Sequence, residues 1–291
     1  MKILDWPRCL GIIPSVIVYF ALGYGIAGAQ QPEQTFQSLL TEVENDPSYA
    51  AGAVQFREPE FRQQGPSLDQ LRGNANLPRR WSSDKAISER AVSLITAFEV
   101  TNKATYVRLY SHSTWPQGAS GVTVGIGYDL GYSTSEDIET DWIQLLGDSA
   151  TKKLETVHGI VGFPAKAAAE HVHDVEISWD NATSNFAAIL KLYAGETIRY
   201  FPNSEELSPD SFGALVSLVY NRGSSTGTLP GDTLDRRREM REIKQLCLSR
   251  KFDLIPDQIR KMERLWQNDS AASGLIKRRE LEALLFEAGL K

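Results

Sequence analysis

The stretch SGVTVGIGYDLGY, residues 120–132, carries the clearest signal in the chain. Val122, Val124 and Ile126 alternate there with Thr123 and two glycines, which is the period of a strand with one buried face. Glycine contributes no side chain and loses backbone entropy in a strand, so its repeated use indicates close approach by a ligand or another backbone. The stretch therefore predicts a strand at a functional site.

A helix is predicted immediately before this strand. From Ile87 onward, apolar side chains fall on one helical face, and Asp84 or Ser88 is available as the N-cap. The pattern ends at AFEV, residues 97–100, so the helix would present Glu99 at its C-terminal end. A carboxyl group is thus expected close to the glycine strand.

The remainder of the chain predicts a helical lobe, because helical spacing recurs between glycine and proline breaks. SPDSFGALVSLVYNRG, residues 208–223, gives the clearest helix: Ser208 caps it, Pro209 occupies the first turn and Gly223 ends it. Further helices are expected near residues 137–146, 149–157, 165–172, 179–200, 237–250, 256–266 and 275–288.

Four motifs in this order resemble the phage-type lysozyme family, which includes pesticin-like bacterial toxins. In that family a glutamate closes the first helix of the catalytic domain and a Thr-x-Gly-x-Gly strand follows. SLVYNRG, residues 217–223, resembles the family's central buried helix, and GLIKRRELEALLF, residues 274–286, its closing arginine-rich helix. The resemblance covers about the last two thirds of the chain. It implies an α+β, lysozyme-like fold with a small antiparallel sheet and a large, mostly helical lobe.

The resemblance assigns catalytic roles to Glu99 and Thr123. Glu99 would protonate the leaving oxygen of a glycosidic bond, and Thr123 would hold the attacking water. Apolar neighbours such as Phe98 would favour the protonated form of the acid. Taken singly, Glu99 could be a solvated helix-end residue and Thr123 an ordinary strand residue. Their spacing favours the functional interpretation.

The chain departs from the family pattern at a third position, where an aspartate lies between the glutamate and the threonine. No Asp or Glu occurs in residues 100–128, and His112 or Ser111 falls about where the aspartate is expected. Three alternatives stay open. Asp129 could take the catalytic role, although it matches no catalytic position and has a structural alternative. The glutamate and threonine could suffice, or the sugar's own hydroxyl could attack in place of water.

Candidate substrate-binding residues are aromatic or polar side chains near these motifs. Tyr128 and Trp115 would stack on sugar faces, with core packing as the alternative for each. Asn221 and Arg222 leave the central helix near its end and would hydrogen-bond N-acetyl groups. His112 would act as a base near neutral pH or lie exposed in a loop.

Basic residues of the closing helix form a further candidate pair. The resemblance implies that one of its arginines, Arg278 or Arg279, contacts the catalytic glutamate, and the sequence does not distinguish them. Arg278 and Glu282 are four residues apart, so an intrahelical ion pair is the alternative. The run Arg236 to Arg238 is mixed with glutamates and predicts a solvated helix face.

The N-terminal residues predict export. Lys2 and Arg8 precede an apolar run and then small residues, which is typical of a signal peptide over residues 1–29, cleaved after Ala29. The protein would be periplasmic or secreted, with no stable membrane anchor after cleavage.

Two segments follow the predicted signal peptide. Residues 30–82 are rich in Gln, Pro, Glu and Arg and predict an extension or linker, with a weakly amphipathic piece around residues 36–43. Residues 83–291 would form the catalytic domain.

Composition limits the partners and cofactors. The net charge of −6 argues against nucleic acid as a partner, since phosphate binding normally requires a basic face. Only Cys247 remains after signal cleavage, so no intrachain disulfide is expected. His171 and His173 supply too few ligands for zinc, and Leu130 replaces the third glycine of a dinucleotide-binding loop. No metal or cofactor is predicted.

The sequence thus predicts a monomeric muramidase, which cleaves β-1,4 bonds between N-acetylmuramic acid and N-acetylglucosamine in the glycan strands of peptidoglycan. Two alternatives remain. One is a non-catalytic, peptidoglycan-binding lysozyme homologue. The other is an antibacterial toxin with the same fold, in which residues 30–82 serve targeting.

Overall fold

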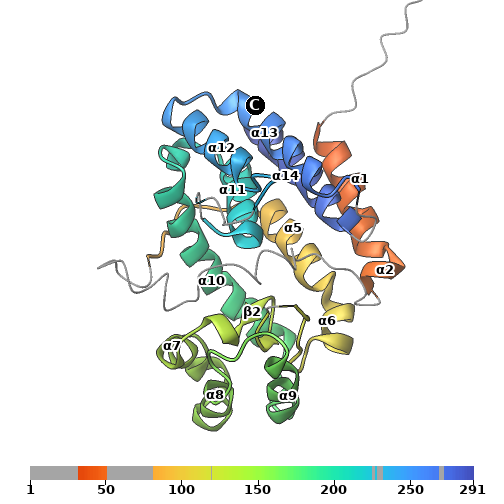
Figure 1. The fold of residues 1–291 in the computed structure, drawn as a ribbon, viewed down its shortest axis with the longest axis vertical. Coiled ribbons are helices and arrows are strands. Elements are labelled where there is room, and N and C mark those ends of the chain that lie inside the picture. Colours follow the sequence, from red (N-terminus) through yellow and green to blue (C-terminus); the bar gives the residue numbers. More distant parts are fainter. Residues whose placement is uncertain (1–31, 51–80, 119, 225–226, 228–231, 269–271) are drawn as a thin grey trace, which may run out of the picture. The chain divides into compact units, whose positions relative to one another are not determined.

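The computed structural model describes residues 32–50, 81–118, 120–224, 227, 232–268 and 272–291 (Figure 1). This part of the chain is mostly helical and contains one two-stranded antiparallel sheet. The predicted α+β class is confirmed at that level. Across the described residues, no helix combines the length and the apolar character needed to cross a bilayer.

The α-helices form two groups along the chain. Those before the sheet are α1 (Pro32–Asn45), α2 (Pro47–Ala50), α5 (Glu89–Val100) and α6 (Lys103–Leu109). Those after it are α7 (Ser135–Leu146), α8 (Asp148–Glu155), α9 (Pro164–His171), α10 (Trp179–Tyr200), α11 (Pro209–Arg222), α12 (Arg238–Leu248), α13 (Ile255–Lys261) and α14 (Ser273–Gly289). Most of these were predicted, with small differences at their ends.

Side-chain caps begin the two helices on which the site depends. The Ser88 hydroxyl accepts a hydrogen bond from the backbone N–H of Ala91 at 3.1 Å, and α5 begins there. The Ser208 hydroxyl does the same for Ser211 at 3.3 Å and begins α11. Gly223 ends α11 with a φ of +70°. The predicted Ser208 cap is confirmed, and of the two caps that the sequence left open for α5 the structure uses Ser88; each cap satisfies otherwise unpaired N–H groups.

The centre of the molecule is α11, which packs against α5, α10 and α14. Its predicted core side chains are completely buried, and so are neighbours on its other faces: Phe212, Ala214, Leu215, Val216, Leu218 and Val219. A helix that is apolar on all sides is stable only inside a core. Each large side chain contributes about 1.5–3 kcal/mol by burial, so α11 anchors the elements around it.

Helix α1 joins this core. Phe36, Leu40 and Val43 lie one or two turns apart and are buried against the helical lobe, where α1 packs on α14 and α5. Lys277 of α14 forms an ion pair with Glu42 at 2.5 Å. The described part of the predicted extension therefore belongs to the same compact unit as the predicted catalytic domain. The predicted signal peptide, residues 1–29, and residues 51–80 lie outside the described residues.

The glycine stretch folds as a tight hairpin. Strand β1 (Thr123–Val124) pairs antiparallel with β2 (Tyr128–Asp129), with Thr123 opposite Asp129. The chain turns at Gly125 and Gly127, whose φ angles are +57° and +76°. The predicted continuous strand is therefore wrong beyond Val124, because both glycines take backbone conformations that other residues disfavour. Both faces of β1 are buried.

Two further segments differ from the predictions: the short helix α6 and the arginine run at residues 236–238. The seven-residue helix α6, which Asn102 caps, has no strong sequence signal. The predicted solvated face at Arg236–Arg238 is wrong for Arg237, which is 5% exposed and donates to the carbonyl of Gly223 at 3.3 Å. The side chain of Arg238 is 52% exposed, as predicted.

Candidate active site

Glu99 is the penultimate residue of α5, and its side chain is only 7% exposed. The Nη1 atom of Arg278 donates to its Oε1 at 3.0 Å. The guanidinium carbon of Arg278 lies 5.5 Å from the centre of the Phe98 ring. Of the two candidate arginines, Arg278 is thus the one that forms this ion pair with the glutamate.

Arg278 also belongs to a buried charge cluster, which comprises Glu99, Arg278, Arg279 and Glu282 with the hydroxyl of Ser217. Glu282 accepts from Arg278 Nε at 3.3 Å, from Arg279 Nη2 at 3.2 Å and from Ser217 Oγ at 2.6 Å. Two carboxylates therefore balance two guanidinium groups, as burial of charge requires. The intrahelical Arg278–Glu282 pair and the contact with Glu99 exist together.

The hairpin turn packs directly against Glu99. A Cβ atom at Gly127 would lie 2.9 Å from Glu99 Oε2 and 3.0 Å from the Tyr220 hydroxyl oxygen. Tyr220 of α11 donates to the carbonyl of Ile126 at 2.8 Å and so ties the turn to the central helix. The close approach that the glycine pattern predicted is made here by a carboxylate and a phenol. Only glycine satisfies both the spacing and the φ of +76°.

Backbone strain lies two residues after Glu99. Thr101 ends α5 with a φ of +66° and is buried. A β-branched residue in this region costs on the order of 1–3 kcal/mol, and such strain is concentrated at functional sites. The strained turn leads into the Asn102 cap of α6 and so fixes where α5 ends.

Thr123 is held rigidly in the hairpin. Its backbone N–H and carbonyl exchange hydrogen bonds with Thr114 at 2.8 and 2.9 Å, and it lies opposite Asp129. The residue is 6% exposed, and its hydroxyl is 3.5 Å from the carbonyl oxygen of Gly121. Thr123 therefore lies in the same hairpin as Gly127, the residue that meets Glu99.

Asp129 makes a structural contact. Its carboxylate accepts from the backbone N–H of Gly121, at 3.1 Å to each oxygen, and from that of Gly131 at 3.0 Å. This arrangement begins the 3₁₀ turn Leu130–Tyr132. It supports the structural interpretation of Asp129, since two backbone amides already use the carboxylate.

The two candidate stacking aromatics differ in their surroundings. Tyr128 is 7% exposed, packs edge-on against Trp142 and donates to Asp141 Oδ2 at 2.8 Å, so the packing alternative fits it. Trp115 is half-buried and packs edge-on against Phe163, which is 76% exposed. Trp115 thus lies at the surface, in the loop before the hairpin.

Asn221 and Arg222 diverge at the end of α11. The Asn221 side-chain oxygen accepts from Arg279 Nη2 at 2.9 Å, which connects it to the buried charge cluster. Arg222 is buried, donates to the carbonyl of Arg236 at 2.6 Å and lies over the Trp266 ring. Asn221 is therefore connected to Glu99 through Arg279, Glu282 and Arg278, whereas Arg222 contacts residues near α12 and α13.

His112 takes part in a different contact. Its ring lies 4.8 Å from that of His173, centre to centre, and its Nδ1 is 2.8 Å from the His173 carbonyl oxygen. No group of three or more His, Cys, Asp or Glu residues able to hold a metal ion occurs in the described part of the chain.

Sequence reasoning missed four residues of this arrangement: Ser217, Tyr220, Gly127 as a partner of Glu99, and Glu282 as a shared anchor. The i+3 and i+4 spacing of Glu282 from the two arginines is a signal that could have found it. The contact between Gly127 and Tyr220 depends on tertiary packing and leaves no local signal.

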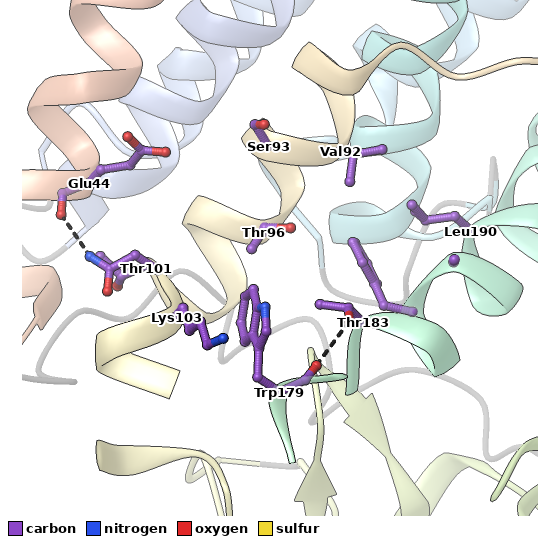
Figure 2. A pocket seen from close by; sticks show the side chains of 12 residues that line it. Glu44, Val92, Ser93, Thr96, Thr101, Lys103, Trp179, Thr183 and Leu190 are labelled. Carbon is purple, nitrogen blue, oxygen red and sulfur yellow. Dashed lines mark hydrogen bonds between the residues drawn. The ribbon is translucent and has the colours of Figure 1, made fainter. Parts of the chain in front are cut away.

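A pocket of about 380 Å³ lies on another face of α5 (Figure 2). Glu99 is not among its lining residues, which come from α1, α5, α6, α10 and the turn between α5 and α6. The pocket and the Glu99 carboxylate are therefore two distinct features of the same helix.

Comparisons with protein-family models and with curated proteins give no match to this chain. The chemistry of the site is consequently the main guide to function.

Proposed function

We propose that this chain is a muramidase of lysozyme-like fold that cleaves β-1,4 bonds in the glycan strands of peptidoglycan, in the periplasm or after secretion. The observation that carries the proposal is the contact of Glu99 with Arg278 on one side and with the Gly127 turn on the other. A largely buried carboxyl at the end of a core helix, with a fixed cation and a side-chain-free neighbour, is suited to proton transfer.

In the first step Glu99 donates its proton to the bridging oxygen. The bond between the anomeric carbon and that oxygen breaks, and the oxygen leaves as a hydroxyl group. The negative charge left on Glu99 is stabilised by Arg278, whose guanidinium is completely buried and therefore weakly screened. Glu282 and Ser217 hold that guanidinium in place.

The second step consumes the oxocarbenium-like centre. Water oriented by Thr123 would add to the anomeric carbon, return a proton to Glu99 and give a reducing end. Because Asp129 is bonded to the Gly121 and Gly131 amides, a route that needs no second carboxylate is favoured. Attack by the sugar's own 6-hydroxyl is such a route: its oxygen would bond to the anomeric carbon, its proton would go to Glu99, and the product would carry a 1,6-anhydro end.

Mass spectrometry of soluble muropeptides tests the proposal. The full chain, Glu99→Gln and the control Glu89→Gln would each be incubated with purified peptidoglycan. Glu89 lies in the first turn of the same helix and is exposed, so its variant controls for charge. The full chain and the control should release fragments, and Glu99→Gln should release them at least about a hundredfold more slowly. Full release by a folded Glu99→Gln protein would refute the proposal.

A second candidate is a glycan-binding homologue without turnover. The bonding of Asp129 to backbone amides favours it, since the hairpin then offers no evident base. This candidate predicts that the full chain sediments with insoluble peptidoglycan and releases no fragments.

A further inference from the structure

The pocket beside α5 has both apolar and polar walls. Val92 of α5 and Phe186 and Leu190 of α10 form the apolar part, and the Trp179 ring stands at the start of α10 (Figure 2). Hydroxyl groups of Ser93, Thr96 and Thr183 also line it. A pocket of about 380 Å³ with this lining has the size and mixed character of a small-molecule site.

Two side chains of opposite charge line the same pocket. Lys103 is the first residue of α6, and Glu44 lies near the end of α1 (Figure 2). Within the described residues, neither side chain forms a hydrogen bond or an ion pair, with the other or with a third residue. The backbone carbonyl of Glu44 accepts from Asn102 at 3.2 Å, which holds α1 at the pocket.

The carboxyl of Glu44 is partly removed from water. Burial raises the pKa of Glu44 above its ordinary value. A ligand ammonium would restore the electrostatic stabilisation that burial removes. Lys103 would in the same way gain from a ligand carboxylate, because charge-assisted hydrogen bonds are stronger than neutral ones.

We propose that this pocket binds a short zwitterionic peptide, with its ammonium on Glu44, its carboxylate on Lys103 and an apolar side chain against the wall formed by Trp179 and Phe186. The stem peptide of peptidoglycan has this chemistry, since it carries a free amine and several carboxylates. The choice of the stem peptide as the source rests on the proposed function. The binding of a zwitterionic peptide as such is inferred from the charges and shape of the pocket alone.

The pocket and the candidate active site use nearby residues of the same helix, α5. Thr96 lines it from α5, and Glu99 follows less than one helical turn later. A peptide held here would therefore place wall material beside the helix that carries the proposed acid. The inference goes beyond glycan cleavage, because it adds a second part of the polymer to what the protein recognises.

Isothermal titration calorimetry of the full chain tests the proposal. The probe is the free tetrapeptide L-alanyl-γ-D-glutamyl-meso-diaminopimelyl-D-alanine. Lys103→Gln and Glu44→Gln each remove one charge, and neither side chain has a hydrogen bond or ion pair to lose among the described residues. Lys166→Gln and Glu170→Gln are matched controls, since both residues are exposed on α9.

The full chain and both controls should bind the tetrapeptide, and each pocket variant should bind it about tenfold more weakly or worse. No binding, or binding that both pocket variants retain in full, would overturn the inference. Equal affinity for L-alanyl-L-alanine would overturn the choice of the wall peptide as the source. Since calorimetry requires no cleavage, a muramidase that ignores the peptide would refute this inference and leave the proposed function standing.

Discussion

Glu99 and Glu239 are both carboxylates that meet arginines inside the protein, but their surroundings differ. The side chain of Glu239 is 1% exposed, and both of its oxygens accept from Arg264, at 2.7 and 2.9 Å, with Arg238 beside them. Glu99 pairs with Arg278, which it shares with Glu282, and a glycine turn approaches its second oxygen. Glu239 thus contacts two arginines, whereas Glu99 contacts one arginine and the glycine turn.

This difference separates a structural ion pair from a candidate catalytic one. Removing an arginine should destabilise the fold in both places, because an unpaired buried carboxylate remains. At Glu99, the stability of the fold should also depend on the absence of a side chain at Gly127, so that a single added methyl group lowers the free energy of unfolding.

The largest effect is expected for Arg278→Met. Glu99 and Glu282 would lose their shared cation, and the free energy of unfolding should fall by about 3–5 kcal/mol. Urea denaturation followed by circular dichroism measures it. Arg264→Met, which leaves Glu239 without its main partner, should fall in the same range. A loss under about 1 kcal/mol for Arg278→Met would show that its ion pairs are not buried as described.

Gly127→Ala should have the next largest effect. The new methyl group would lie 2.9 Å from Glu99 Oε2, at a φ of +76°. Strain and overpacking together should lower the free energy of unfolding by about 2–4 kcal/mol.

Gly147→Ala is the matched control for this change, because Gly147 has a φ of +78° and a Cβ atom added there would meet no other atom within 4 Å. The control should lose only about 1–2 kcal/mol in the same urea titration. Equal losses in both variants would mean that the backbone angle, rather than the Glu99 contact, explains the glycine at position 127.

Glu239 should contribute to stability in a pH-dependent manner. Burial is the largest single influence and raises its pKa, but the hydrogen bonds from Arg264, Arg238 and its own backbone N–H, together with the charge of Arg264, outweigh burial and hold the pKa below the ordinary 4.5. A carboxyl with a lowered pKa stabilises the fold above its unfolded pKa, and this contribution is lost as pH falls through the folded value. Glu239→Gln should therefore be less stable than the full chain at pH 7, and the gap should narrow below about pH 4.5. Urea midpoints measured from pH 7 to pH 3 test this, and a constant gap would contradict it.

The smallest effect concerns Cys247. Burial raises the pKa of its thiol to about 12, so the thiolate needed for reaction is scarce at pH 8. Residues 30–291, in which Cys247 is the only cysteine, should react negligibly with a disulfide reagent such as dithionitrobenzoate when folded and fully when unfolded in urea. Rapid reaction of the folded protein would show that α12 opens readily.

Local sequence signals predicted the helices that carry the site. Ser88 and Ser208 are recognisable caps, and the apolar spacing of α11 identified the buried helix. The hairpin was less predictable, because alternation over Val122–Gly127 fits either a strand or a turn with buried flanks. The φ angles of Gly125 and Gly127 decide between them, and they depend on what packs around the turn.

The partners of Glu99 required the three-dimensional structure. The resemblance left two candidates for the arginine that contacts Glu99, Arg278 and Arg279, which are adjacent on one helix. The packing of α14 against α5 selects Arg278. The burial of α1 was similarly hidden, since Phe36, Leu40 and Val43 give only a weak helical pattern next to a polar segment. Long-range contacts of this kind have no signature in local spacing.

The most direct test of the central claim is the rate at which folded Glu99→Gln releases muropeptides, compared with the full chain at equal protein concentration. The account predicts that the full chain cleaves peptidoglycan and that the variant loses activity at least about a hundredfold, as expected for loss of a general acid. It also predicts an unchanged circular dichroism spectrum for the variant. Unchanged release by the variant would contradict the assignment of Glu99 as the acid, and with it the proposed role of the Arg278 and Gly127 contacts.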